Sequence, residues 1–123
     1  IEKKVYVLEL DYDRLAEKFT TPFRFEPLSK FPDVTRDLAL VANSKTTCGE
    51  IEDAIRSACK GNVRDVKLFD IYTGEQVGLG KKSMAFTVTF KANGDKPLEN
   101  EEVDGFVKRI LGSLKHRLNV DLR

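Results

Sequence analysis

The sequence predicts an α+β fold in which two helices cover one β-sheet. Three observations support this prediction: four short apolar segments suited to β-strands, two longer segments with apolar residues at helical spacing, and the alternation of the two kinds along residues 37–122. The chain has 123 residues, of which 41% are hydrophobic. That is enough apolar surface for one self-sufficient core, so we expect a single folded domain.

The first strand and the first helix of this domain are expected between residues 37 and 62. Residues 37–42, DLALVA, predict a short buried strand. A helix follows, because Thr47 and Glu50 have the spacing of a capping box. Its apolar face is formed by residues at helical spacing, namely Ile51, Ala54, Ile55 and Ala58.

The remaining strands and the second helix complete a βαββαβ order. Residues 63–72 and 83–90 predict two strands joined by a glycine-rich loop, and residues 119–122 predict a last short one. Residues 101–117 predict a helix whose apolar stripe is Val103, Phe106, Val107, Ile110 and Leu114. This order folds most simply as a four-stranded antiparallel sheet with both helices on one face, the ferredoxin-like arrangement. The other face of the sheet is left open.

The strand at residues 63–72 leaves two alternatives for its outer end. Val66 and Leu68 are apolar and suit the core, but Asp70 and Tyr72 share their parity. A β-bulge near Phe69 would turn Phe69 and Ile71 inward, so that Asp70 and Tyr72 face outward toward a ligand. Without a bulge, Tyr72 is a rim residue of the core.

Residues 1–26 are interpreted as a lead-in and linker, and residues 27–123 as the domain. Residues 4–10, KVYVLEL, predict a strand, and residues 11–19 a short helix. Residues 20–36 contain three prolines and predict a mostly extended connector. Because the chain starts at Ile1 rather than Met, we expect a fragment or a processed chain.

Composition limits the classes of function. Lys and Arg number 21 and Asp and Glu 20, leaving a formal charge of +1, which argues against a polybasic protein that binds nucleic acid through bulk charge. Any nucleic-acid contact must therefore be local. The two cysteines, Cys48 and Cys59, indicate reduced thiols rather than a disulfide framework. With no apolar run of about 20 residues and no signal-peptide pattern, we expect a cytoplasmic protein without a membrane partner.

The sequence offers no catalytic residue and no metal site. Its one histidine, His116, is expected at the surface of the second helix, whereas Cys48 and Cys59 belong to the first. No cluster of ligands surrounds His116 in the sequence. The loop at residues 74–83, GEQVGLGKKS, fails the phosphate-loop pattern and joins two strands instead of a strand and a helix.

The same loop has two interpretations. It is either a flexible turn whose glycines permit positive φ, or a turn that also carries Lys81 and Lys82 to an RNA backbone while Asp70 and Tyr72 face the bases. The alternation of residues 83–90 puts Met84, Phe86, Val88 and Phe90 under the helices and Ser83, Ala85, Thr87 and Thr89 on the open face. Because the open face then lacks the aromatic platform of an RNA recognition motif, we expect contacts at strand ends and in the 73–82 loop.

Three stretches resemble one known family. They are FPDVTRDLA (31–39), LFDIYTGEQVGLGKKSMAF (68–86) and PLENEEVD (97–104). They are similar to the signatures of the ferredoxin-fold anticodon-binding domain, the C-terminal module of the bacterial phenylalanyl-tRNA synthetase β subunit. The resemblance covers about residues 27–123, and residues 1–26 resemble the end of the preceding catalytic-like module. One departure is Glu99 where the family often has Thr or Ser, which weakens the cap of the second helix unless Asn100 takes that position.

The resemblance implies a noncatalytic fragment that binds the anticodon stem-loop of phenylalanine tRNA. In the family, the residues that match Asp70, Tyr72 and Ser83 lie near the anticodon bases: the ring stacks on a base, and the carboxylate and hydroxyl bond to base edges. Arg36 belongs to the signature as a further RNA-binding candidate, although pairing with a nearby carboxylate is the favoured interpretation. The parent enzyme attaches phenylalanine to its tRNA with ATP and magnesium as an α2β2 assembly, with catalysis on the α subunit. We expect no cofactor in this fragment, which should be monomeric alone.

Two alternatives share the βαββαβ order. An ACT-like regulatory domain would bind an amino acid at a domain interface. An acylphosphatase would need an arginine-bearing phosphate loop after the first strand, where this chain has Asn43, Ser44 and Lys45.

Overall fold

The computed structural model describes residues 3–19, 25, 30–92 and 96–123. In chain order the elements are α1 (Tyr12–Lys18), β1 (Val34–Asn43), α2 (Cys48–Ala58), β2 (Val63–Tyr72), a 3-10 turn η1 (Glu75–Val77), β3 (Lys81–Phe90), α3 (Asn100–Leu118) and β4 (Asp121–Leu122). From β1 onward this is the predicted βαββαβ order.

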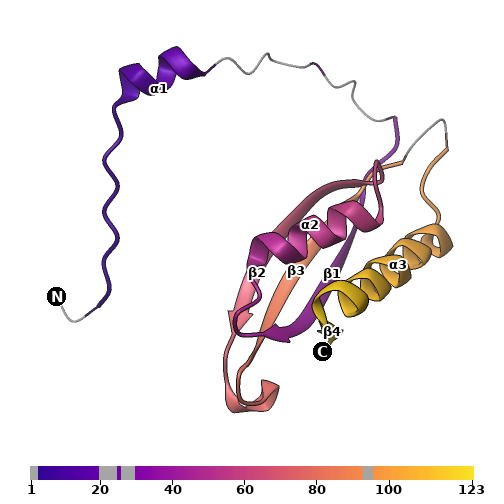
Figure 1. The fold of residues 1–123 in the computed structure, drawn as a ribbon. Helices are drawn as coiled ribbons and strands as arrows, with labels where there is room; N and C mark the ends of the chain where they lie inside the picture. The colour runs from indigo at the N-terminus through magenta and orange to yellow at the C-terminus, as the bar shows by residue number, and fades with distance from the viewer. Residues whose placement is uncertain (1–2, 20–24, 26–29, 93–95) are drawn as a thin grey trace.

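The four strands form one antiparallel sheet in the order β2-β3-β1-β4. The central pair, β1 and β3, is matched along its whole length, from Val34 opposite Phe90 to Asn43 opposite Lys81. Helices α2 and α3 lie side by side on one face of this sheet (Figure 1). The predicted ferredoxin-like α+β fold is confirmed, with one face of the sheet left without a helix.

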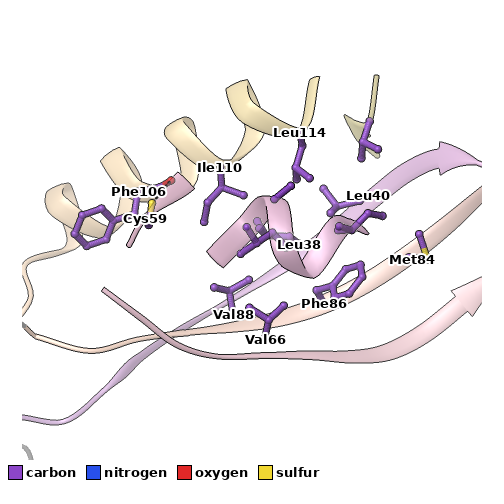
Figure 2. Close-up of a cluster of buried hydrophobic side chains, with 14 of the residues drawn as sticks. Leu38, Leu40, Cys59, Val66, Met84, Phe86, Val88, Phe106, Ile110 and Leu114 are labelled. Carbon is purple, nitrogen blue, oxygen red and sulfur yellow. Dashed lines mark hydrogen bonds between the residues drawn. The ribbon is translucent and has the colours of Figure 1, made fainter. Parts of the chain in front are cut away.

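The core lies between the helices and the sheet. On β3 the alternate residues Met84, Phe86, Val88 and Phe90 are buried, as their spacing predicts. Figure 2 shows side chains of β1 and β3 pointing toward the helices, where the apolar stripe of α3 meets them. The rings of Phe90 and Phe106 stack with their centroids 5.6 Å apart. The centre of the inner face of the sheet is therefore covered by packing.

Two strands are longer than predicted. β1 begins at Val34 instead of residue 37, because residues 34–36 continue the pairing with the end of β3. β3 begins at Lys81 instead of residue 83, since Lys81 and Lys82 pair with the end of β1. A strand extends as far as its partner does, a limit that local sequence does not show. Residues 20–24 and 26–29 of the predicted connector lie outside the described residues.

The prediction for the lead-in is half correct. The short helix is present as α1, and the carboxylate of Asp11 caps it by accepting from the Arg14 backbone N–H at 3.2 Å. The strand predicted at residues 4–10 is wrong, because in the described part of the chain no strand pairs with this segment. A strand needs a hydrogen-bonded neighbour, whatever its β-propensity.

Of the two alternatives for β2, the structure has the β-bulge. Leu68 lies opposite Phe86 and Asp70 opposite Ala85, so Phe69 is the extra residue. Asp70 and Tyr72 therefore face the open side of the sheet. Ile71 lies opposite the buried Met84 on the helix side, but the expectation that Phe69 and Ile71 enter the core is wrong, since they are 56% and 53% exposed. This end of the edge strand extends beyond the packed core.

The capping box of α2 is confirmed. The backbone N–H of Thr47 donates to the Glu50 carboxylate at 2.7 Å, and the Glu50 N–H donates to the Thr47 hydroxyl at 3.3 Å. At α3 the N-cap is Glu99, whose N–H donates to the Glu102 carboxylate at 3.2 Å. Asn100 does not take the cap position.

We predict that Phe86→Ala lowers the free energy of unfolding by about 3–5 kcal/mol, because it removes a fully buried ring at the centre of the core. Urea unfolding followed by circular dichroism measures this change. Met84→Leu, which keeps the volume of a neighbouring buried side chain, should cost less than about 1.5 kcal/mol. Equal losses for the two variants would contradict this packing.

The capping box also predicts a pH dependence of stability. The backbone N–H and hydroxyl of Thr47 bond to the Glu50 carboxylate and lower its pKa. A lowered pKa in the folded state means that Glu50 stabilises the fold above its unfolded pKa and that this contribution is lost as pH falls through the folded value. The stability difference between wild type and Glu50→Gln should therefore be larger near pH 6 than near pH 3. A difference that does not change with pH would contradict the role of this carboxylate.

Candidate functional site

Two adjacent rows of residues cross the open face of the sheet near the end of β2. In the first row, Tyr72 lies opposite Ser83, and Ser83 lies opposite Val41. In the second, Asp70 lies opposite Ala85, and Ala85 lies opposite Ala39. Directly paired residues share a face, so the structure brings Asp70, Tyr72 and Ser83 together. Small side chains form the floor between them.

The three predicted residues differ in exposure. Asp70 is exposed and Tyr72 is 37% exposed, whereas only 4% of Ser83 is exposed. Ser83 has the predicted side of the sheet but not the predicted access to solvent. Its neighbours in the row, Val41 and Tyr72, have larger side chains. Ser83 is therefore much less accessible to a ligand than Asp70 and Tyr72.

The ring of Tyr72 is held by contacts on two sides. It packs so closely against Gly74 that a Cβ at this glycine would overlap the Tyr72 hydroxyl. The guanidinium carbon of Arg123 lies 5.4 Å from the ring centroid, within the range of a cation–π contact. The orientation of the ring is thus set before any ligand arrives.

Arg123 reaches this ring from the opposite edge of the sheet. Its backbone N–H donates to the Ala39 carbonyl at 2.8 Å, which continues the β4 pairing by one residue. Its Nη2 donates to Gln76 Oε1 at 3.2 Å, in the turn after β2. The sequence interpretation missed both Arg123 and Gln76. Extending the alternation of the last strand by one residue would have put Arg123 on the open face.

The two lysines of the predicted site do not lie together. Lys81 pairs with Asn43 and is exposed on the open side, whereas Lys82 pairs with the buried Ala42 on the helix side. There the charge of Lys82 contributes to lowering the pKa of Glu50. The prediction that both lysines sit on a mobile loop beside Tyr72 is corrected: they are the first residues of β3, and successive strand residues face opposite sides.

The loop between β2 and β3 is a defined turn. Residues Glu75–Val77 form η1, and Val77 is buried. Gly78 and Gly80 have φ of 85° and 72°, so the predicted need for glycines with positive φ is confirmed. A shallow pocket in this loop is lined by Thr73, Gly74, Glu75, Gly78, Leu79, Gly80 and Lys81. One of its lining residues, Gly74, also lies against the Tyr72 side chain.

Arg36 lies on the other side of the sheet. It pairs with Val88, whose side chain is in the core, and its Nη2 donates to Asn100 Oδ1 at 3.0 Å. The same nitrogen is 4.0 Å from the carboxylate of Asp104. The interpretation that Arg36 pairs with a nearby carboxylate is confirmed. It ties β1 to the start of α3 and does not join Asp70 and Tyr72.

The reactive side chains are not arranged for catalysis. His116 is exposed on α3, as predicted. Burial, together with its hydrogen bond to Glu52, raises the pKa of the Cys48 thiol, and burial raises that of Cys59. Both therefore favour the unreactive thiol form. The described residues hold no group of three or more side chains suited to a metal ion, and no helix among them has the length and apolar character needed to span a membrane.

The turn after β1 does not offer a phosphate cradle. The Ser44 N–H donates to the Gly80 carbonyl at 2.8 Å, and the Lys45 N–H donates to Asn43 Oδ1 at 3.0 Å. At the start of α2, the carboxylate of Glu50 occupies the amide of Thr47. These amides already have hydrogen-bond partners, so they are not available to an acyl phosphate. The negative charge of the Glu50 carboxylate would also repel a phosphate. This geometry does not favour the acylphosphatase alternative.

An open sheet face with an exposed ring, a carboxylate and a guanidinium at its strand ends is the arrangement of a small α+β binding module. Comparison with known families identifies which one. The family model for the ferredoxin-fold anticodon binding domain matches residues 29–123, and the chain belongs to this family.

Curated relatives agree with this assignment. The chain is 38% identical over 120 residues to the phenylalanine–tRNA ligase beta subunit of Streptococcus pneumoniae strain R6. It is 36% identical over 121 residues to the proteins of the same name from Geobacillus kaustophilus and from Bacillus subtilis strain 168. Each alignment covers 98% of this chain but 15% of the relative. The chain thus spans a small part of these proteins, and the ACT-like alternative is not favoured.

Proposed function

We propose that this chain is the anticodon-binding module of a phenylalanine–tRNA ligase β subunit, and that its open sheet face binds unpaired nucleotides of the tRNA anticodon loop. One observation carries the proposal. Asp70 and Tyr72 are exposed in adjacent rows of the same face, beside a floor of small side chains. Family membership and the names of the relatives support it.

The chemistry of these two residues suits a single-stranded loop. Unstacked bases present a π-face, on which an aromatic ring such as Tyr72 can stack, and N–H groups at their edges. The carboxylate of Asp70 accepts hydrogen bonds from such N–H groups. Ala39 and Ala85 leave space above the sheet for a planar base. A base contact by the Ser83 hydroxyl requires that binding expose this residue, because it is buried in the free protein.

Backbone contacts are proposed for Lys81 only, among the basic residues singled out in the sequence. It is exposed on the open side, at the start of β3 and at the edge of the loop pocket. Lys82 and Arg36 face the helix side, where Arg36 bonds to Asn100, and both are left out of the proposed interface. An interface with only a few local phosphate contacts does not need a strongly basic surface. It is therefore compatible with the formal net charge of +1.

The role of the module in a parent enzyme is to supply binding energy. A parent α2β2 enzyme would attach phenylalanine to tRNA with ATP and magnesium, and with its catalytic site on the α subunit. Binding of the anticodon, far from the catalytic site, would help to orient the acceptor end of the tRNA toward that site. Residues 1–26 would link the module to the part of the β subunit that precedes it.

Tyr72→Ala should weaken binding of an anticodon stem-loop by about 1–3 kcal/mol, because a base loses its stacking partner. Fluorescence anisotropy with a labelled stem-loop measures the loss. Tyr72→Phe keeps the ring and should bind within about twofold of wild type if stacking dominates. Unchanged affinity in Tyr72→Ala would remove stacking from the proposal.

Gly74→Ala tests the orientation of the ring without removing it. A methyl group at this position would overlap the Tyr72 hydroxyl and push the ring from its place, so we expect weaker stem-loop binding with little change in the unfolding temperature. Gly49→Ala is the matched control, since a Cβ there meets no atom within 4 Å. If both variants bind like wild type, the placement of the ring does not matter for recognition.

A further inference from the structure

The guanidinium of Arg123 lies beside the Tyr72 ring, the proposed stacking surface of the site. It is 5.4 Å from the ring centroid and bonds to Gln76 in the turn beside the ring. Its own backbone is fixed by the 2.8 Å hydrogen bond to Ala39. The side chain thus spans the open face from the β4 edge to the end of β2.

The guanidinium of Arg123 forms no ion pair with a side chain in the described parts of the chain. Arg56 pairs with Asp65 at 3.5 Å, Arg64 with Asp33 at 2.9 Å, and Lys115 with Asp121 at 2.7 Å. In residues 3–19, 25, 30–92 and 96–123, no Asp or Glu forms an ion pair with Arg123, and its one side-chain hydrogen bond goes to a neutral amide. A guanidinium bonded only to a neutral group retains its attraction for an anion.

The shape of arginine permits both contacts at once. The planar group can lie over an aromatic ring while its five N–H donors point outward in the plane. Gln76 takes one of these donors, through Nη2. The remaining donors have the fork geometry that binds a phosphate through two oxygens. A lysine in this position would supply the charge but neither the stacking nor the fork.

We propose that Arg123 is a phosphate-binding and positioning residue of this site: it holds the Tyr72 ring in the free protein and binds the RNA backbone phosphate beside the nucleotide that stacks there. The inference rests on the proposed function and extends it to a residue outside the sequence signatures. In the proposed interface, Arg123 takes the place of Lys82 as the second basic residue beside Lys81.

The test is the salt dependence of stem-loop binding, measured by anisotropy for wild type, Arg123→Gln, Arg123→Lys and Arg109→Gln. Each phosphate contact adds about 0.7–0.9 to the slope of log K against log salt concentration. Arg123→Gln should lower the slope by about this amount and weaken stem-loops of different loop sequence alike. Arg123→Lys should keep the slope and bind less tightly. Arg109→Gln is the matched control. The guanidinium carbon of Arg109 also lies over an aromatic ring, 4.9 Å from the ring centroid of Phe106, but Arg109 belongs to α3, away from the proposed site.

An unchanged slope in Arg123→Gln, or an equal slope loss in Arg109→Gln, overturns the inference. Urea unfolding of each variant separates lost binding from lost folding. If Arg123→Gln is unfolded, Arg123→Met decides, because it also removes the charge: a lowered slope supports the phosphate contact and a wild-type slope overturns it. If wild type binds no stem-loop, the proposed function fails as well. If wild type binds and Tyr72→Ala weakens it while the Arg123 slopes do not change, only the inference on Arg123 fails.

Discussion

The alternation of side chains along β3 is the constraint on which the rest of the structure depends. Met84, Phe86, Val88 and Phe90 are buried against the helices, and because successive strand residues point to opposite faces, the residues between them must lie on the other face. The ten-residue pairing with β1 extends this division across the centre of the sheet. A shift of register by one residue would bury polar side chains and expose the aromatic core. The binding face is thus fixed by the packing of the opposite face.

The bulge at Phe69 adapts this constraint at the edge strand. Before it, Leu68 shares a side with the buried Phe86; after it, Asp70 and Tyr72 lie opposite Ala85 and Ser83 on the open face. One inserted residue therefore turns a core-facing strand into one that presents a ring and a carboxylate to solvent. The turn that follows supplies Gly74, against which the ring packs. Local backbone irregularity in β2 and regular pairing in β1 and β3 together build the site.

The features predicted correctly from sequence are those with a local cause. The Thr47 cap and the parity of β3 follow from side chains within a few residues of one another, and the same local pattern raised the bulge in β2 as one of two alternatives. The errors concern what a distant segment contributes. The segment at residues 4–10 has strand propensity but no described partner strand, Ser83 is buried within its row of the sheet, and Arg123 arrives from the far edge of the sheet. Cross-strand neighbours depend on topology and register, which short-range patterns specify only in part.

The most direct test of the central claim is to map which face of the sheet binds RNA. Nuclear magnetic resonance of the isotope-labelled domain, titrated with the anticodon stem-loop of phenylalanine tRNA, reports this residue by residue. We expect the largest chemical-shift changes at Ala39, Asp70, Tyr72, Ala85 and Arg123, and small changes along α2 and the outer side of α3. Changes concentrated on the helices, with the open face unaffected, would contradict the proposal that the open face binds RNA.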